Sequence, residues 1–282
     1  MNPLQKLARA TIPRPIRNWL RSPITSLHWG LDELRFRLGL NPLVELRPGF
    51  KLRCHPAALR TAYRAQVFDP DQIAEFDSFI QHCRSGMVFF DIGAHFGLFS
   101  MAALRFGGAT ARAVAVDPSP MAVRMMSVMR RLNGISNWDI IEAAVSDHSG
   151  YEPMVSIGVQ AAGYFIPAHQ AEQSEVMQVQ TLTLDELMDR FQAKPTHIKI
   201  DVEGFEEAAL AGATRLLSIE PAPILFLELH HRLVRERQRN PAALLRWIED
   251  RGFHFFSTAG TRLEPEVMLK SDLLRVVARR CL

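Results

Sequence analysis

Short apolar runs alternate with amphipathic segments along the chain. Apolar runs of about four to eight residues are typical of strands that are buried on both faces of a parallel sheet. Between the runs, apolar residues recur at helical spacing; in 69–84, for example, Ile73, Phe76, Ile80 and Cys83 share one face. Strands are expected in the segments 87–92, 111–118, 138–147, 196–204, 221–231, 253–257 and 273–279.

Helix ends are marked by polar residues and proline. Ser119, with Pro120 directly after it, is typical of a helix start. Thr183 and Glu186 have the spacing of a capping box, which predicts a second helix start. A further helix is expected over 205–217, directly after the fourth strand.

Strands that alternate with helices predict an α/β fold with a doubly wound, mostly parallel sheet. The last two strands are joined without a helix, which predicts an antiparallel edge pair. In 151–183 the alternating pattern is broken by glycines, so we expect a hairpin or lid insertion there. The predicted division is a basic arm and lead-in over 1–68 and one domain over 69–282.

Composition is that of an ordinary globular protein: 48% of the 282 residues are hydrophobic and 22% are charged. No apolar run approaches the roughly 20 residues that cross a bilayer. Cys54, Cys83 and Cys281 are scattered and form no CxxC pair. They argue against a disulfide framework or zinc knuckle and predict reduced thiols in a cytoplasmic setting.

Basic residues are concentrated at the N-terminus. Residues 1–40 contain seven Lys or Arg and two acidic residues, a net charge of +5; the chain has +3, so the remainder has −2. A body this close to neutral argues against nucleic-acid binding. The arm could pack on the domain, lie in solvent, or make peripheral contact with an anionic membrane through its apolar residues, which are Trp19, Leu20, Leu27, Trp29 and Leu31. We favour packing, because prolines interrupt any long helix lying on a membrane.

A carboxylate and two glycines stand where the first strand becomes a helix, in FFDIGAHFGLFS (89–100). In a doubly wound sheet, ligands bind beyond the carboxyl ends of the strands, which places Asp91 and Gly93 beside a ligand. Gly93 and Gly97 would let backbone approach that ligand without a Cβ, and the helix N-terminus would attract an anionic group. Asp117 ends the second strand and could accept hydrogen bonds from ribose hydroxyls. These features predict a nucleoside cofactor.

The spacing of the glycines favours one such cofactor over another. A nicotinamide dinucleotide requires G-x-G-x-x-G, whereas this loop has Gly93-x-x-x-Gly97. Asp91 would repel a pyrophosphate but suits the ammonium group of S-adenosylmethionine. A nicotinamide-dependent oxidoreductase and a non-catalytic cofactor-binding partner protein stay open as alternatives, because fold alone does not decide function.

Four blocks of the chain resemble the FkbM family of S-adenosylmethionine-dependent methyltransferases. They are FFDIGAHFGLFS, AVAVDPSP, AAVSDHSG and IKIDVEGFEEAALAGATRLL, with PILFLEL behind the last, and they span roughly 73–256. The resemblance implies a seven-stranded, Rossmann-like class I methyltransferase sheet and methyl transfer to a hydroxyl of a sugar or other small natural product. The cofactor contacts expected on these blocks are Asp91, Gly93, Ala94, Gly97, Asp117 and Ala143.

The chain departs from the family pattern at two positions of the expected cofactor site. It has His95 where the family usually has asparagine, and Asp117 where glutamate is usual. Asp117 is shorter by one methylene, so the affinity for the cofactor could differ while the chemistry is retained.

A hydroxyl acceptor must lose its proton during methyl transfer. Asp201 and Glu203 stand at the end of the fourth strand with period-two spacing, so both can face the cofactor, and His230 at the end of the fifth strand is a good base by its intrinsic pKa. Lys199 shares the same side, and a buried Lys199–Asp201 pair that only stabilises the fold is the competing interpretation.

Three other residues on these strands could contribute to the site or only to the fold. Glu228 is expected on the same side of the fifth strand as His230, near the end of that strand. His231 is expected at the surface, and His197 is expected to be structural because it lies at the amino end of its strand. The Asp201, Glu203 and His230 side chains could bind a divalent metal such as magnesium, but none is predicted, because the resemblance does not demand one.

Overall fold

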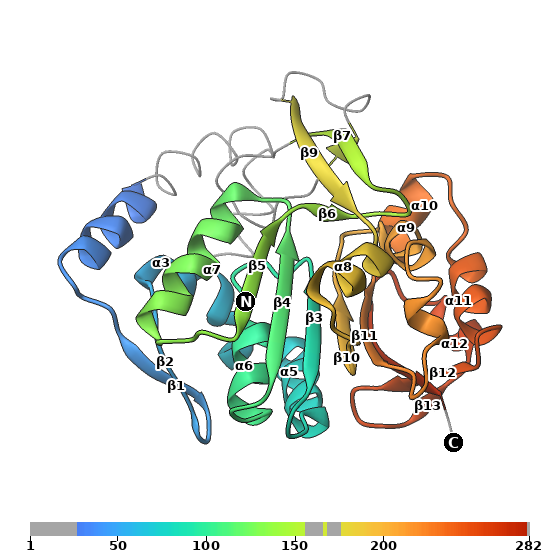
Figure 1. The fold of residues 1–282 in the computed structure, drawn as a ribbon, viewed down its shortest axis with the longest axis horizontal. Helices are drawn as coiled ribbons and strands as arrows, with labels where there is room; N and C mark the ends of the chain where they lie inside the picture. The colour runs from blue at the N-terminus through green and yellow to red at the C-terminus, as the bar shows by residue number, and fades with distance from the viewer. Residues whose placement is uncertain (1–26, 156–165, 168–175, 281–282) are drawn as a thin grey trace, which may run out of the picture.

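The computed structural model describes residues 27–155, 166–167 and 176–280. Within these residues, eight strands form a central sheet in the order β13-β12-β14-β11-β10-β3-β4-β5 (Figure 1). The neighbouring strands β11, β10, β3, β4 and β5 of this order all run parallel to one another. The strands are β3 (Val88–Ile92), β4 (Arg112–Asp117), β5 (Trp138–Glu142), β10 (His197–Ile200), β11 (Ile224–Leu229), β12 (Phe253–Ser257), β13 (Arg262–Leu263) and β14 (Leu274–Arg280).

The predicted α/β class, with a mostly parallel, doubly wound sheet, is confirmed. The two last predicted strands pair antiparallel, as expected, but β14 lies between β11 and β12 and runs antiparallel to both. The two-residue strand β13 adds an eighth member at the edge.

Helices cover both faces of this sheet, and successive strand residues point to opposite faces. Phe90 and Ile92 belong to one buried cluster and Phe89 to the other. The first cluster includes residues of α8 (Leu184–Phe191), α9 (Glu206–Ala211), α11 (Pro241–Glu249) and α12 (Pro265–Met268). The second includes residues of α5 (Pro70–His82), α6 (Leu98–Phe106) and α7 (Pro120–Leu132).

A second, smaller sheet stands over the carboxyl ends of β3 and β4 (Figure 1). It has the order β6-β9-β7-β8, and β7 and β9 pair antiparallel, as a hairpin requires. Part of the predicted insertion, 156–165 and 168–175, lies outside the described residues. The four strands are β6 (Ala144–Val145), β7 (Gly150–Val155), β8 (Ile166–Pro167) and β9 (Val176–Leu182).

Two expected elements are interrupted. The single strand expected over 138–147 divides at Ala143, because β6 leaves the central sheet to pair with β9. The helix expected over 205–217 ends at Ala211, because the next residue, Gly212, packs against the chain after β6. A Cβ on Gly212 would lie 2.2 Å from the Ser146 carbonyl oxygen.

The predicted helix starts are present. The Ser119 hydroxyl accepts a hydrogen bond from Ala122 N at the start of α7, and the Thr183 hydroxyl accepts one from Glu186 N at the start of α8. Only half of the capping box forms, because the Glu186 carboxylate accepts a hydrogen bond from the Ser149 hydroxyl instead.

The lead-in to the domain contributes to its core. Phe50 and Tyr63 are fully buried in the same cluster as Phe89. No helix in the part of the chain that the structure describes is long and apolar enough to cross a membrane. The elements of the lead-in are β1 (Leu43–Arg47), β2 (Phe50–Arg53), α3 (Pro56–Ala58), the π-helix η1 (Leu59–Tyr63) and α4 (Ala65–Phe68).

Candidate functional site

A cavity of about 350 Å³ opens at the carboxyl ends of β3, β4 and β10. This is the edge at which doubly wound sheets bind ligands. Of the residues expected to contact a cofactor, Gly97 does not line the cavity; of those expected in catalysis, His230 does not. The expected residues that do line it are Asp91, Gly93, Ala94, Asp117, Ala143, Asp201 and Glu203.

The two glycines of the loop are required by contacts within the protein. Gly93 and Gly97 have φ of +76° and +71°, a region that favours glycine. A Cβ on Gly93 would lie 1.9 Å from the Asp201 carbonyl oxygen, and one on Gly97 would lie 2.3 Å from the Trp138 ring. Both glycines are thus required by close packing, Gly93 against the residue after β10 and Gly97 against β5. That they also make room for a ligand stays a prediction.

Asp91 is buried at the end of β3 and is held by the first turn of α6. Its Oδ2 accepts hydrogen bonds from the backbone N of Ser100 at 3.0 Å and from the Ser100 hydroxyl at 2.6 Å. Burial raises the pKa of Asp91 to about 6, against the lowering effect of the Ser100 hydrogen bonds. The carboxylate therefore lies on the cavity wall in one fixed orientation.

Asp117 joins the loops that follow β3 and β4. Its Oδ2 accepts a hydrogen bond from His95 N at 2.7 Å, and its Oδ1 accepts one from Ser119 N at 2.9 Å. Burial raises the pKa of Asp117 to about 7. The carboxylate thus fixes the shape of the cavity wall as well as facing the cavity.

The departure at His95 has a structural explanation. His95 has φ of +51°, where asparagine, aspartate and histidine are enriched among non-glycine residues. Histidine can therefore replace asparagine without a change of backbone. Its ring stacks on Phe96 with a centroid distance of 4.0 Å.

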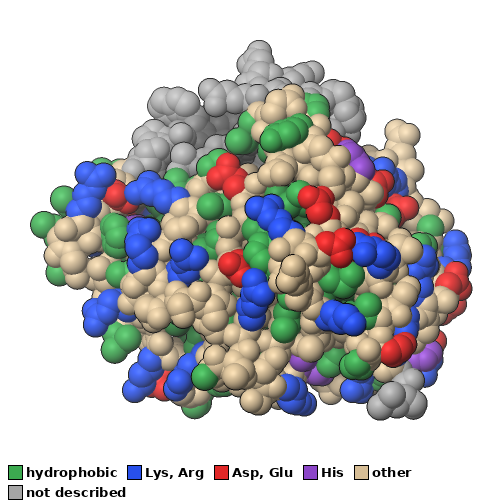
Figure 2. Space-filling view, viewed as in Figure 1, with side chains coloured by type: hydrophobic (Ala, Val, Ile, Leu, Met, Phe, Trp, Pro, Cys, Tyr) green, Lys and Arg blue, Asp and Glu red, His purple; other side chains and the backbone are tan. Residues whose placement is uncertain are grey.

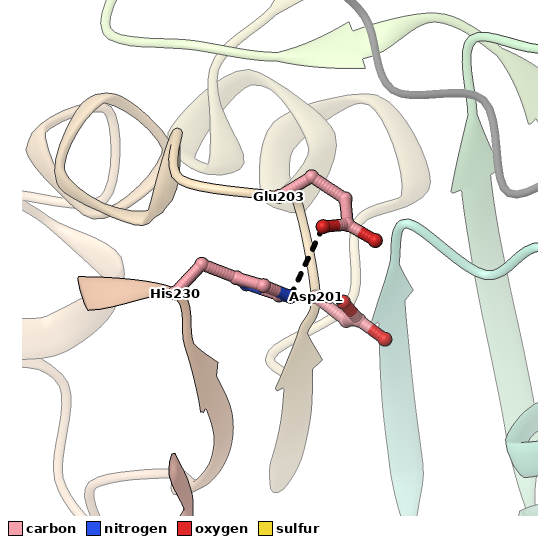
Figure 3. Close-up of side chains that lie close together, drawn as sticks. All are labelled: Asp201, Glu203 and His230. Atoms are coloured by element: carbon pink, nitrogen blue, oxygen red, sulfur yellow. Dashed lines mark ion pairs between the residues drawn. The ribbon is translucent and has the colours of Figure 1, made fainter. Parts of the chain in front are cut away.

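The three residues expected in catalysis are brought together, as Figure 3 shows. His230 Nε2 lies 3.1 Å from Glu203 Oε2 and 3.9 Å from Asp201 Oδ1. The period-two spacing predicts that Asp201 and Glu203 lie on the same side of one strand. The two side chains do lie close together, but β10 ends at Ile200, and both residues belong to the loop and turn that follow it. Glu203 itself has φ of +51° in that turn.

Glu206, which the sequence reasoning missed, orients the histidine. It is fully buried in the first turn of α9, and its Oε1 lies 2.8 Å from His230 Nδ1. A carboxylate only accepts, so Nδ1–H donates to Glu206 and Nε2 faces Glu203. Burial alone would lower the pKa of His230, but Glu206, Glu203 and Asp201 raise it to about 9. Glu206 falls within the IKIDVEGFEE block, which was the signal available for it.

Lys199 forms the buried pair with Asp201 that the competing interpretation describes. Its Nζ lies 3.2 Å from Asp201 Oδ2, 3.4 Å from Glu75 Oε1 and 3.9 Å from Glu228 Oε2. Arg275 from β14 binds the same Glu75 and Glu228, at 3.0 and 2.6 Å. Burial alone would lower the pKa of Lys199, but the surrounding carboxylates raise it well above its usual range. The ammonium group is therefore charged and holds Asp201 in place.

The other two histidines considered for the site, His197 and His231, are both buried, although only His197 is expected from the sequence to be structural. His197 is buried at the amino end of β10, where its Nδ1 lies 2.8 Å from the Thr196 hydroxyl, consistent with a structural residue. The expectation of a surface position for His231 is wrong. Its side chain is buried and its Nδ1 lies 3.0 Å from the Ser271 carbonyl oxygen, because α10 (His231–Glu236) starts there and ends the alternation of the strand.

The sequence profile of the methyltransferase FkbM domain matches residues 91–255, which include all the residues expected in cofactor binding and catalysis, together with Lys199 and Glu206. The chain belongs to the FkbM methyltransferase family. The resemblance found over roughly 73–256 is confirmed by this match. Among curated proteins, none matches the chain.

Solved methyltransferase structures are similar to this FkbM chain at low sequence identity. An rRNA methylase from Streptococcus thermophilus is 11% identical, with 76% of this chain and 99% of that chain covered and a TM-score of 0.44. A precorrin-6y C5,15-methyltransferase from Geobacter metallireducens GS-15 is 13% identical over 75% and 90%, with a TM-score of 0.42. A SAM dependent methyltransferase from Aquifex aeolicus is 13% identical over 79% and 95%, with a TM-score of 0.40.

Three side chains of this FkbM methyltransferase are close enough to share a divalent cation. One ligand atom each of Asp201, Glu203 and His230 lies within 4.8 Å of the others. Oxygen ligands with one imidazole would suit manganese or magnesium. The expectation that the reaction uses no metal stays a prediction.

Proposed function

We propose that this FkbM methyltransferase binds S-adenosylmethionine in the cavity and methylates a hydroxyl oxygen of a sugar or other small natural product. The proposal rests on one observation above all. In a chain of this family, the ends of β3, β4 and β5 bring Asp91, Ala94, Asp117 and Ala143 to one cavity.

The charge of the cavity suits this cofactor. Seven acidic side chains outnumber the one lysine of its lining, Lys199, even though burial raises the pKa of Asp117 to about 7 and that of Glu228 to about 8. S-adenosylmethionine has a sulfonium and an ammonium group. Asp117, at the end of β4, would accept hydrogen bonds from the ribose hydroxyls, and Asp91 would face the ammonium group. The seven acidic side chains are those of Glu75, Asp91, Asp117, Glu152, Asp201, Glu203 and Glu228.

When bound, S-adenosylmethionine supplies an electrophilic methyl group on sulfur. The residues of the chain position the acceptor and remove its proton, since positioning provides much of the rate in such displacements. We assign proton removal to Glu203, which lines the cavity. His230, with a pKa of about 9, is protonated at neutral pH and serves as a hydrogen-bond donor to Glu203 rather than as the base.

Calorimetric titration of the protein with S-adenosylmethionine, its demethylated product and NAD tests the cofactor. We expect the first two to bind and NAD to fail. Asp117→Ala should weaken binding about 10- to 150-fold, the effect of losing hydrogen bonds to a charged group. Glu142→Ala is the matched control, because Glu142 is exposed on the paired strand and does not line the cavity. Unchanged affinity in Asp117→Ala would refute the assignment.

A screen of hydroxyl acceptors with labelled methyl donor tests the reaction. Glu203→Gln should lower turnover while leaving affinity for the donor unchanged, and Glu207→Gln, on the exposed side of α9, should change neither. Methyl transfer to any acceptor excludes the non-catalytic alternative. Wild-type turnover in Glu203→Gln would place proton removal elsewhere.

A further inference from the structure

Leucines form an exposed stripe on the helix at residues 27–37 and just beyond its end. Leu27, Leu31, Leu34 and Leu38 follow one another at intervals of four, three and four residues, which places them on one face. Together with Leu40 and Leu43 they are 43–66% exposed. Six of the eleven exposed large hydrophobic side chains in the described residues therefore lie between positions 27 and 43. An apolar concentration of this kind marks an interaction site.

The opposite side of this helix is fixed to the domain. Buried Asp32 accepts a hydrogen bond from Arg60 Nε at 2.6 Å, and Glu33 accepts one from Arg124 of α7 at 3.0 Å. The Phe36 ring lies 4.6 Å from the His55 ring. These contacts hold the helix in one orientation, so the leucine stripe is turned outward by the fold. Packing on the domain and contact with a partner are therefore compatible.

Basic charge accompanies the stripe. Residues 1–40 have a net charge of +5 against −2 for the rest of the chain, and five of their seven cations precede residue 27, outside the described residues. On the helix, the largely exposed Arg35 and Arg37 pair with Asp32 and Glu33 at 3.3 and 3.1 Å. Arg60 and Arg124 bind the same two carboxylates, so four arginines surround two acidic residues, a local net charge of +2. Figure 2 shows hydrophobic and Lys or Arg side chains next to each other at the left end of the molecule, where Figure 1 places this helix. An apolar face flanked by cations is typical of helices that lie in the interface of an anionic membrane.

We propose that helix 27–37 is a docking surface for anionic membranes, with the leucine stripe among the lipids and the basic residues at the headgroups. Charge decides between this partner and a second copy of the chain. Pairing two copies through the stripe would bring two arginine clusters of like charge together, whereas anionic lipid neutralises them.

The docking surface is connected to the cavity. Arg60, which holds Asp32, belongs to η1, and the next residues of η1, Thr61, Ala62 and Tyr63, line the cavity. The Tyr63 hydroxyl donates to the Phe96 carbonyl oxygen at 2.9 Å, in the loop after β3. If the helix docks on a membrane, only η1 therefore separates the docked helix from the cavity.

The test is sedimentation of the full chain with vesicles of phosphatidylcholine alone or mixed with phosphatidylglycerol. We expect binding only to the mixed vesicles, weakened by added salt. Leu31→Gln with Leu34→Gln should weaken it roughly tenfold or more, because two leucines no longer enter the interface. Val267→Gln with Leu273→Gln, similarly exposed elsewhere, should bind as the wild type does. Melting temperatures of both double variants should equal that of the wild type.

Two outcomes would overturn the proposal. Equal binding by the wild type and the stripe variant would assign any membrane contact to other residues. Dimers detected by light scattering, lost in the stripe variant and accompanied by no vesicle binding, would assign the stripe to a second copy of the chain.

Discussion

Glu206→Gln removes a negative charge from beside the His230 ring and keeps an oxygen that can accept the Nδ1 proton. Burial alone would lower the pKa of His230, and the raised value of about 9 depends first on the hydrogen bond and charge of Glu206, then on Glu203 and Asp201. In the variant, the pKa of His230 should therefore fall towards the ordinary value of about 6.5.

The size and the sign of the effect on stability follow from the same pKa. A pKa of about 9 in the folded protein, against about 6.5 in the unfolded chain, corresponds to stabilisation on the order of 3 kcal/mol. Because the folded pKa of His230 is the higher one, this contribution is present in full below about pH 6.5. It is lost as the pH rises through 9. Glu206→Gln should lose most of it at neutral pH and below.

The assay is NMR titration of labelled His230, combined with urea unfolding from about pH 6 to pH 10. Glu207→Gln makes the same chemical change on the exposed side of the same helix and should leave the pKa of His230 in place. His230 titrating near 6.5 in the wild type, or at the same pH in wild type and Glu206→Gln, would refute the reasoning.

Three further predictions concern the surroundings of the cavity. Gly93→Ala should lower the melting temperature and abolish cofactor binding, because the new Cβ would meet the Asp201 carbonyl oxygen. Gly108→Ala is the control, with a similar φ of +77° and nothing within 4 Å of the new Cβ; it should cost only about 1–2 kcal/mol of stability. Calorimetry measures both variants. Lys199→Met should destabilise the fold by about 3–5 kcal/mol in urea unfolding, since Asp201 loses its lysine and Glu75 and Glu228 are left to Arg275 alone, whereas Lys270→Met at the surface should be neutral. Removal of divalent cations with EDTA should leave the melting temperature and cofactor affinity unchanged, because a cation between the side chains of Figure 3 would have to displace the His230 proton, whose pKa the neighbouring carboxylates raise to about 9; a rise in melting temperature with Mn²⁺ would contradict this.

The fold and the place of the site were predictable because both depend on local patterns. Apolar runs separated by amphipathic segments specify parallel strands, and parallel strands end at one edge of the sheet. Asp91, Asp117 and Asp201 each follow such a run, so their convergence needs no knowledge of the packing. The same reasoning failed at 138–147, where pairing with β9, distant in sequence, draws the second half of an apolar run into another sheet.

The partners of the site residues were not predictable, because they come from elements that sequence spacing does not relate to the site. Arg275 and Glu75, which meet at 3.0 Å, are 200 residues apart and belong to β14 and α5. The reason for Gly93 was also hidden, since the atom that excludes a Cβ is a backbone oxygen of β10's continuation. A glycine in a motif indicates a close approach but does not say by which atom.

Asp201 and Glu203 lie beside the same imidazole, and their surroundings give them different roles. Burial would raise the pKa of Asp201, but Lys199 and His230 together lower it, so this carboxylate stays ionised and its Oδ2 is held by the lysine. Burial raises the pKa of Glu203, against the opposing charge of His230, and no lysine lies beside it among the ion pairs of the described residues. A base is most effective when its pKa lies closer to the working pH, and two groups whose pKa values are moved apart can divide the work. Asp201 is thus suited to pairing with the Lys199 ammonium group, whereas Glu203 is suited to accepting the proton of a hydroxyl.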